Sequence, residues 1–259
     1  MSTSDSCSCV VESGLAVVTL HHAPHNLLGP VLMQSLLDTL EQARSAGARA
    51  VLLKSSLRHF SAGADLSLFE AATAGGEGLA VSPVQFLAAL EAFPLPIVVC
   101  VHGVCVGGGF ELALACDFIV AGRSAKLGSV EVTLGINPLM GAVQRQVARC
   151  GALRAKELSM LGRRYDAETL ERWNLINRVV DDEHLEEAAL AVATELANGP
   201  TLAHQITKEL ARLAEDQGVR AADREMERLQ QALWNSEDLK IGLESLQKNG
   251  PGHAKFVGR

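Results

Sequence analysis

Glu111 lies where a carboxylate is unusual. It follows three consecutive glycines at 107–109 and belongs to the otherwise apolar segment 110–116. A carboxylate that faces a core is costly unless it is paired, protonated or held in a polar cavity, and these conditions shift its pKa toward values that serve acid–base catalysis. In the alternative interpretation, Glu111 only complements the dipole at the N-terminus of a helix.

Glu131 could join Glu111 at one site. It lies in the segment 128–135, after the strand and turn that we expect to follow the Glu111 helix, so the chain can return to the same cavity. Two carboxyl groups that converge on one small molecule can act as acid and base if their surroundings separate their pKa values. The glycines at 107–109 would expose backbone amides that favour developing negative charge. Alternatively, they only allow close packing of a helix on a strand.

Other glycine-rich and serine motifs are excluded. Counted from Gly107, the dinucleotide-binding fingerprint requires Gly or Ala at Leu112, and the Gly-Lys-Ser/Thr ending of a P-loop is absent. Ser61 is preceded two positions earlier by His59, where the nucleophile elbow of serine hydrolases has a glycine. We therefore interpret Ser61 as a turn residue.

The histidines do not predict a metal site. His21, His22 and His25 cluster before a helix, but no accompanying ligands follow a recognisable metal-binding spacing. We interpret these three as surface residues and His102, beside an apolar strand, as structural. No metal is predicted.

The elements that must position these residues alternate along the first two thirds of the chain. The clearest helix is predicted over 30–45, with Pro30 at its first position, Leu32, Leu36 and Leu40 on one face, and Gly47 just beyond its end. Short aliphatic runs predict strands at 15–20, 49–54, 96–101, 117–121 and 175–180. This alternation predicts an α/β fold.

From residue 181 onward the pattern becomes helical, and glycines near 199, 218 and 250 divide it into three or four helices. Their apolar faces could pack on the chain's own core or on a neighbouring subunit. We divide the chain into a mobile leader over 1–10, a core domain over 11–195 and a C-terminal helical region over 196–259. The stretch 71–78 is expected to be flexible.

Bulk properties are those of a globular protein, because 48% of the 259 residues are apolar and a sizeable core can form. A formal net charge of -7 gives no electrostatic footprint for nucleic acid or an anionic membrane. No segment reaches the roughly 18 apolar residues that span a bilayer, and the first residues do not resemble a signal peptide. We predict a cytoplasmic protein whose six cysteines are reduced.

Four segments resemble the enoyl-CoA hydratase/isomerase, or crotonase, family in order and separation: FSAGADL, VCVGGGFELALACDFIVAG, AKLGSVEVTLGINP and the final KFVGR. The resemblance covers nearly all of the chain after the leader. It implies a spiral of ββα units with a C-terminal helical region that builds homotrimers or hexamers. The implied substrate is an acyl-CoA thioester, so coenzyme A is part of the substrate and no cofactor is predicted.

The resemblance also implies roles for individual residues. The backbone amides of Ala64 and Gly108 would form an oxyanion hole for the thioester oxygen. Glu111 would position and deprotonate water for attack at the β-carbon, and Glu131 would exchange the proton at the α-carbon. The following matched positions are implied to bind substrate: Ala62, Asp65, Leu66, Leu139, Lys255 and Phe256.

One departure from the family pattern affects the predicted reaction. Relatives have a glycine-rich turn near the catalytic water, where this chain has Leu139, and a bulky side chain there could shift the turn or narrow the acyl pocket. Val130 also replaces a frequent proline. The leading hypothesis is an enoyl-CoA hydratase that adds water to a trans-2-enoyl-CoA. The alternatives are an isomerase or other crotonase-type reaction, and a non-catalytic acyl-CoA-binding protein.

Overall fold

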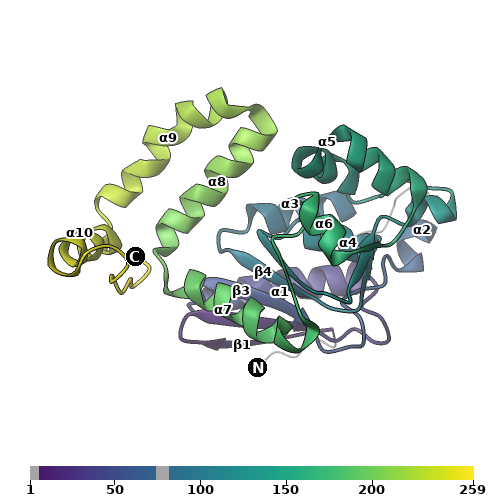
Figure 1. Cartoon of the computed structure of the whole chain (residues 1–259), viewed down its shortest axis with the longest axis horizontal. Helices are drawn as coiled ribbons and strands as arrows, with labels where there is room; N and C mark the ends of the chain where they lie inside the picture. The colour runs from purple at the N-terminus through teal and green to yellow at the C-terminus, as the bar shows by residue number, and fades with distance from the viewer. Residues whose placement is uncertain (1–5, 74–81) are drawn as a thin grey trace.

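The computed structural model describes residues 6–73 and 82–259 and contains two β-sheets with flanking helices (Figure 1). The larger sheet has the order β1-β2-β3-β4-β6-β9, in which only β1 and β2 are antiparallel. Its strands are β1 (Cys7–Glu12), β2 (Leu15–Leu20), β3 (Ala50–Ser55), β4 (Ile97–Val101), β6 (Phe118–Gly122) and β9 (Arg178–Val180). The smaller sheet contains β5 (Val104–Val106), β7 (Lys126–Gly128) and β8 (Tyr165–Asp166).

The helices of the core follow the strands in sequence. They are α1 (Pro30–Ser45), α2 (Leu66–Thr73), α3 (Pro83–Ala92), α4 (Gly108–Leu114), α5 (Ala142–Leu161), α6 (Ala167–Arg172) and α7 (Leu185–Asn198), with short 3₁₀ helices η1 (Glu131–Leu134) and η2 (Asp182–His184). The chain ends with α8 (Thr201–Gln217), α9 (Val219–Trp234) and α10 (Glu237–Asn249).

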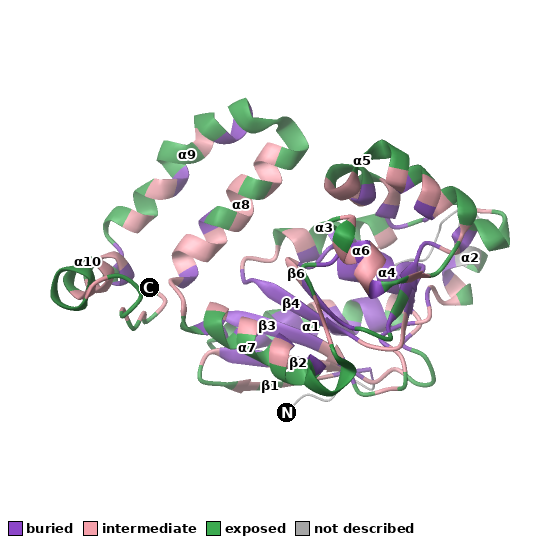
Figure 2. Cartoon of the chain, in the orientation of Figure 1, coloured by how far each residue is buried: buried purple, intermediate pink, exposed green. Residues whose placement is uncertain are grey.

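Both faces of the larger sheet are covered, which explains why its inner strands are apolar throughout. In β4, Ile97, Val99 and Val101 belong to one core, and Val98 and Cys100 belong to the other. The first core includes the apolar sides of α1, α3 and α4, and the second lies against α7. Figure 2 shows these strands as the most continuously buried part of the chain.

Two consecutive units, each of two strands and a helix, position the candidate site. β4 joins the larger sheet and β5 the smaller one before α4, and β6 and β7 repeat this arrangement before η1 and α5. β5 and β7 pair in parallel, with Val106 opposite Gly128. The segments that follow these two strands therefore start side by side. The predicted α/β class with ββα units and a helical C-terminal region is confirmed.

The C-terminal helices extend away from the sheets, with α8 and α9 side by side and α10 at the far end (Figure 1). Arg49, which precedes β3, ties this region to the core. Its guanidinium donates to the carbonyl of Gly199, the hydroxyl of Thr201 and the carbonyl of Phe256 at 2.5, 2.9 and 3.2 Å. The boundary predicted at residues 195 and 196 falls inside α7, before α8 begins at Thr201.

β1 overturns part of the predicted leader. Residues 7–10, expected to be mobile, belong to an edge strand in which Cys7 pairs with Leu20 and Glu12 with Leu15. Cys7 is only 1% exposed. Backbone hydrogen bonds to β2 hold this segment, and its serine-rich composition did not reveal them. Residues 1–5 lie outside the described part of the chain.

The other predicted elements agree with the structure to different degrees. The helix over 30–45 and the strand over 15–20 are confirmed, and three further strands are shifted by about one residue. The last predicted strand, 175–180, is a strand only from Arg178, because Leu175 and Ile176 are buried in the turn before it. In the stretch 71–78, the first residues end α2 and 74–78 lie outside the described residues.

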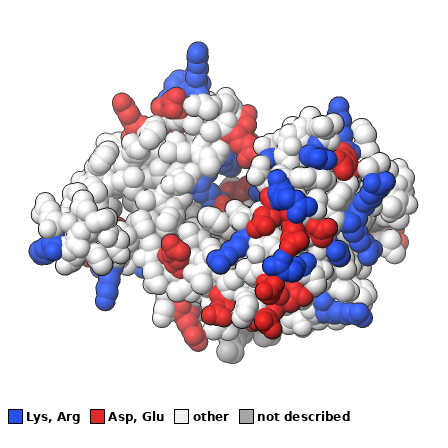
Figure 3. All heavy atoms as spheres, in the orientation of Figure 1, with Lys and Arg blue, Asp and Glu red and all other residues white. Residues whose placement is uncertain are grey.

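None of the six cysteines forms a disulfide. Within residues 6–73 and 82–259, no helix is both long and apolar enough to cross a membrane. The cytoplasmic location stays a prediction. On the face shown in Figure 3, basic and acidic side chains are interspersed over the surface, so this face offers no broad basic patch to a polyanion.

Candidate active site

Three segments that are far apart in the sequence lie side by side at the ends of β5 and β7. Ser61 forms an isolated parallel bridge with Cys105 of β5, and the Val106 amide donates to the Ser61 carbonyl at 3.2 Å. On the other side of β5, the Gly107 amide donates to the Gly128 carbonyl at 3.0 Å. The turn after Ser61, the start of α4 and the start of η1 are thereby brought together.

Two glycines allow this close approach. A β-carbon on Gly109 would lie 2.5 Å from the β-carbon of Ser61, so only glycine fits there. Gly107 has φ +53°, in the region that favours glycine, and caps the start of α4. The prediction that these glycines serve only helix–strand packing is too narrow, because Gly107 also lies against the Glu131 carboxylate.

Glu111 is buried in the first turn of α4 and is 2% exposed. Its Oε1 accepts hydrogen bonds from the backbone amides of Met140 and Ala142 at 2.9 and 3.0 Å. Burial and, to a smaller extent, the nearby charge of Glu131 raise the pKa of Glu111 to about 7, although backbone amide donors oppose the rise. A carboxyl group with this pKa can exchange protons near neutral pH.

Glu131 begins η1 and is 7% exposed. Neither of its carboxyl oxygens has a hydrogen-bond partner among the described residues. A β-carbon on Gly107 would lie 3.5 Å from Glu131 Oε1, so the carboxyl group faces the turn that leads into α4. Burial raises the pKa of Glu131 as well. The predicted pair therefore converges, and an unpartnered buried carboxyl group of this kind needs a ligand or a proton.

The amides of Ala64 and Gly108 lie next to the two carboxyl groups. A β-carbon on Gly108 would be 3.5 Å from the Ala64 nitrogen. Neither amide donates a hydrogen bond to another described residue. Gly108 begins a helix, whose first amides have no partner within the helix. Two free donors beside acid–base groups can stabilise an oxygen that gains negative charge.

The neighbouring amides of the 60–66 turn are already used. Ala62 donates to the His25 carbonyl at 3.0 Å, and Asp65 donates to the Leu28 carbonyl at 2.7 Å. The Asp65 side chain accepts the Ser67 amide at the start of α2, which lowers the pKa of Asp65. Substrate binding by Ala62 and Asp65 stays a prediction.

Leu66 and Leu139 are two further predicted substrate contacts. Leu66 is 70% exposed, and Leu139 is at the limit between half-buried and exposed. Binding by both residues stays a prediction. Leu139 does not displace the turn from Glu111, because the amide of Met140 directly after it donates to that carboxylate.

The C-terminal residues matched to the family motif do not reach this site within one chain. The Phe256 carbonyl accepts from Arg49 at the start of β3, and the Phe256 ring lies by Gly242 of α10. The 60–66 turn follows the other end of β3. Lys255 precedes Phe256 in this tail, and substrate binding by both residues stays a prediction.

Residues that sequence reasoning missed complete the site. Leu28 pairs with Ala64 in a parallel bridge, and its amide donates to the Gly63 carbonyl at 2.8 Å. The Met140 and Ala142 amides hold Glu111. Backbone contacts of this kind do not depend on residue type and cannot be predicted from it. The one signal in the sequence was the departure from the family's glycine-rich turn at 138–141.

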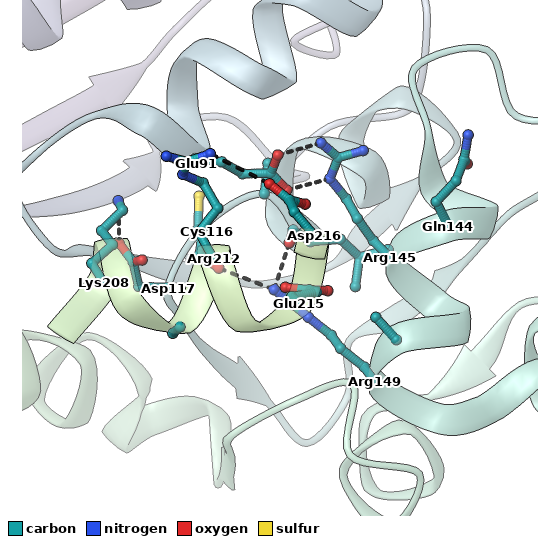
Figure 4. Close-up of a pocket in the computed structure, with 14 residues that line it drawn as sticks. Glu91, Cys116, Asp117, Gln144, Arg145, Arg149, Lys208, Arg212, Glu215 and Asp216 are labelled. Atoms are coloured by element: carbon teal, nitrogen blue, oxygen red, sulfur yellow. Dashed lines mark hydrogen bonds and ion pairs between the residues drawn. The ribbon is translucent and has the colours of Figure 1, made fainter. Parts of the chain in front are cut away.

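A cavity of about 410 Å³ lies beyond the C-terminal end of α4, away from Glu111 and Glu131 (Figure 4). Most of its charged groups are engaged with one another or with backbone carbonyls. Arg145 makes two bonds to Glu91 at 2.6 and 2.5 Å, and Lys208 of α8 lies 2.8 Å from Asp117. Arg149 donates to two carbonyls at the end of α4. We interpret this cavity as a junction between α8 and the core.

The histidines show no metal arrangement. Among the described residues, no group of three or more His, Cys, Asp or Glu side chains could hold a metal ion. His102 bonds to the Leu57 carbonyl at 2.7 Å, which fits a structural role. Ser61 is fully buried, and its hydroxyl donates to the Asn26 carbonyl at 2.7 Å, so it acts as the turn residue that was predicted.

Comparison with known proteins shows which family has this sequence and fold. The sequence pattern of the family described as Enoyl-CoA hydratase/isomerase matches residues 11–254. The chain belongs to this family. The match extends over the segments that contain Glu111 and Glu131 and over the C-terminal helices, and it confirms the crotonase resemblance seen in the sequence motifs.

Individual relatives support the same assignment. A probable enoyl-CoA hydratase of Rhizobium meliloti (strain 1021) is 35% identical over 224 residues, 84% of this chain and 85% of the relative. The 2,3-dehydroadipyl-CoA hydratase of Escherichia coli (strain K12) is 32% identical over 251 residues, 96% and 97% of the two chains. A crystal structure of an enoyl-CoA hydratase subunit from Geobacillus kaustophilus HTA426 superposes with a TM-score of 0.89 at 29% identity, covering 98% of both chains. The fold is therefore crotonase-like, and the chain is an enzyme of this family.

Proposed function

We propose that this enzyme adds water reversibly across the 2,3 double bond of a trans-2-enoyl-CoA to give a 3-hydroxyacyl-CoA. The observation that carries the proposal is the convergence of Glu111 and Glu131, both buried and both with raised pKa values, beside the free amides of Ala64 and Gly108. A reaction that moves protons next to a thioester uses all four groups.

In this mechanism the thioester oxygen accepts from the amides of Ala64 and Gly108. Glu111 takes a proton from water while the water oxygen bonds to C3. The π electrons of the double bond move toward the thioester and form an enolate, whose oxygen gains charge at the two amides. Glu131 then delivers a proton to C2, and exchange with solvent restores both carboxyl groups. The Met140 and Ala142 amides favour the ionised form of Glu111 that accepts the proton.

The position of the 138–141 turn relative to Glu111 favours hydration over isomerisation. An isomerase would be expected if the bulky turn displaced the first carboxylate from a catalytic water and left one carboxylate to transfer protons. The two amide bonds to Glu111 argue against such a displacement. A non-catalytic binding protein would be expected if the glutamates diverged, and their convergence argues against it.

A homotrimer or hexamer is part of the proposal. An apolar groove of about 280 Å³ runs between α8, α9 and α10, and Trp234, Leu243 and Leu246 are 63%, 52% and 52% exposed on these helices. Exposed apolar surface on helices that extend from the body is suited to contact with further copies of the chain. Such contact could also bring a neighbour's Phe256 toward the 60–66 turn.

The first experiment follows the loss of absorbance of the conjugated thioester of crotonyl-CoA, with mass detection of the product. Wild type is compared with the Glu111→Gln/Glu131→Gln double variant. A gain in the mass of one water in wild type alone supports hydration by this pair. Migration of the double bond without added water would support an isomerase, and binding without turnover of any enoyl thioester would support a binding protein.

The proposed oxyanion hole is tested by Ala64→Pro, which removes one amide donor. We expect kcat to fall about a hundredfold to a thousandfold, because one such donor is worth about 3–4 kcal/mol in the transition state. Circular dichroism and the melting temperature establish that the variant is folded. A folded variant with near-normal kcat would exclude the Ala64 amide from the reaction.

A further inference from the structure

Two adjacent apolar residues in the turn before α5 have different environments. Leu139 is 36% exposed, whereas Met140 is 1% exposed. Leu139 is the residue that departs from the family pattern, because it replaces a glycine. Met140 is the residue whose side chain is buried beside the candidate site.

Met140 lies near both parts of the proposed active site, the Glu111 carboxyl group and the Gly108 amide. Its amide donates to Glu111 Oε1 at 2.9 Å. A β-carbon on Gly108 would lie 3.3 Å from the Met140 sulfur, so the thioether lies beside the start of α4. The same β-carbon would lie 3.5 Å from the Ala64 nitrogen, so Met140 flanks the position proposed for the thioester oxygen.

Leu28 completes an apolar wall at the same place. A β-carbon on Gly108 would lie 3.3 Å from Leu28 Cδ1, the same distance as from the Met140 sulfur. Leu28 is fully buried, and its pairing with Ala64 ties its backbone in place. Met140 is the more adaptable of the two, because its unbranched thioether has more rotatable bonds.

We propose that Met140 determines acyl-chain selectivity: its side chain limits the room for acyl carbons beyond the reacting double bond, so that the enzyme prefers short, unbranched enoyl thioesters. This proposal rests on the proposed hydration reaction. With the thioester oxygen at Ala64 and Gly108 and the β-carbon near Glu111, the acyl group would pass the Met140 thioether beside Gly108. Carbons attached after C3 then compete with the thioether for space.

The test compares wild type with Met140→Ala on crotonyl-CoA and trans-2-decenoyl-CoA. We expect the ratio of kcat/KM for the ten-carbon substrate to that for the four-carbon substrate to rise at least about tenfold, since one methylene in an apolar pocket discriminates about 10- to 200-fold. Met140→Leu, which keeps most of the volume, should leave this ratio within about threefold of wild type. Met33→Ala, which truncates a fully buried methionine of α1, is the matched control for lost core volume and should not change the ratio.

Binding of saturated thioesters separates this inference from the proposed reaction. Calorimetric Kd values for butyryl-CoA and decanoyl-CoA report acyl room without any chemistry, and Met140→Ala should improve decanoyl-CoA binding relative to butyryl-CoA. If Met140→Ala does not fold, Met140→Val provides the same comparison with a smaller change in volume. An unchanged preference in both assays in a folded variant, or a shift caused by Leu139→Ala instead, would overturn the role of Met140. Absence of hydration in wild type together with the expected binding shift would overturn only the proposed reaction.

Discussion

Carboxylates lie near both ends of α4, and they differ in their burial and in their partners. At the N-terminal end, Glu111 accepts only backbone amides and Glu131 has no partner among the described residues. Beyond the C-terminal end, Glu91 pairs with Arg145, and Asp117 lies 2.8 Å from Lys208 (Figure 4). Carboxylates are thus fully buried without cations at one end and half-buried with cations at the other.

This difference separates a reactive site from a structural junction. A cation beside a buried carboxylate favours its ionised form and opposes the effect of burial, as Lys208 does for the pKa of Asp117. Without a cation, burial and the mutual repulsion of two carboxylates raise the pKa of Glu111 to about 7. The cavity at the junction is well formed, but most of its charged side chains already bond to one another or to backbone carbonyls, so the shape of a cavity alone does not identify the site.

The largest expected effect comes from removing a proposed acid–base group near the N-terminal end of α4, where the carboxyl groups have no cation partner. We expect Glu131→Gln to lower kcat for crotonyl-CoA hydration by about a hundredfold to ten thousandfold with the fold intact, the range that a positioned acid–base group supplies. Asp117→Asn changes a carboxylate beyond the C-terminal end of α4 that is paired with Lys208, and it should leave kcat within about threefold of the wild-type value. Stopped-flow or steady-state absorbance assays measure both. Equal losses in the two variants would contradict the distinction between the two ends.

The second prediction concerns the pH dependence of stability. The pKa of Glu111 is raised from 4.5 to about 7 in the folded state, so between these values the folded chain binds more protons than the unfolded chain. The free energy of unfolding therefore falls as pH rises through this window. Glu111→Gln removes the ionisable group while its amide oxygen can still accept both backbone bonds. Its stability relative to wild type should rise between pH 5 and pH 8, by at most about 3 kcal/mol.

Urea denaturation at several pH values between 5 and 8 measures this difference. A constant gap between the two curves would show that Glu111 has an ordinary pKa in the folded protein. Such a result would remove the contrast with the paired carboxylates, although it would leave the position of Glu111 beside the free amides unchanged.

The smallest expected effect comes from the junction itself. Lys208 and Asp117 are 12% and 22% exposed, so breaking their pair should destabilise the protein moderately, by about 1–2 kcal/mol for Lys208→Met. A double-variant cycle with Asp117→Asn isolates the interaction energy between the two groups. An interaction energy near zero would mean that this ion pair does not help to hold α8 to the core.

Much of the fold could be predicted from the sequence because its signals are local. The helix over 30–45 has Pro30 at its first position and an apolar face, and the aliphatic run of β4 is buried on both sides. β1 could not be predicted in this way, because only its pairing with β2 converts a polar, serine-rich segment into an edge strand. The glutamates and glycines of the site were also predictable, since residue type and order carry the family resemblance.

The sequence by itself determined which groups could do chemistry: a glutamate after three glycines, a second glutamate after the next pair of strands, and turns rich in glycine. The tertiary structure decided whether they meet, through the parallel pairing of β5 with β7 and the bridge between Ser61 and Cys105. It also decided that Met140 is buried whereas Leu139, directly before it, is exposed. The reason is physical, because side-chain type is written along the chain, whereas burial, pKa shifts and the direction of a turn residue arise only when distant segments pack together.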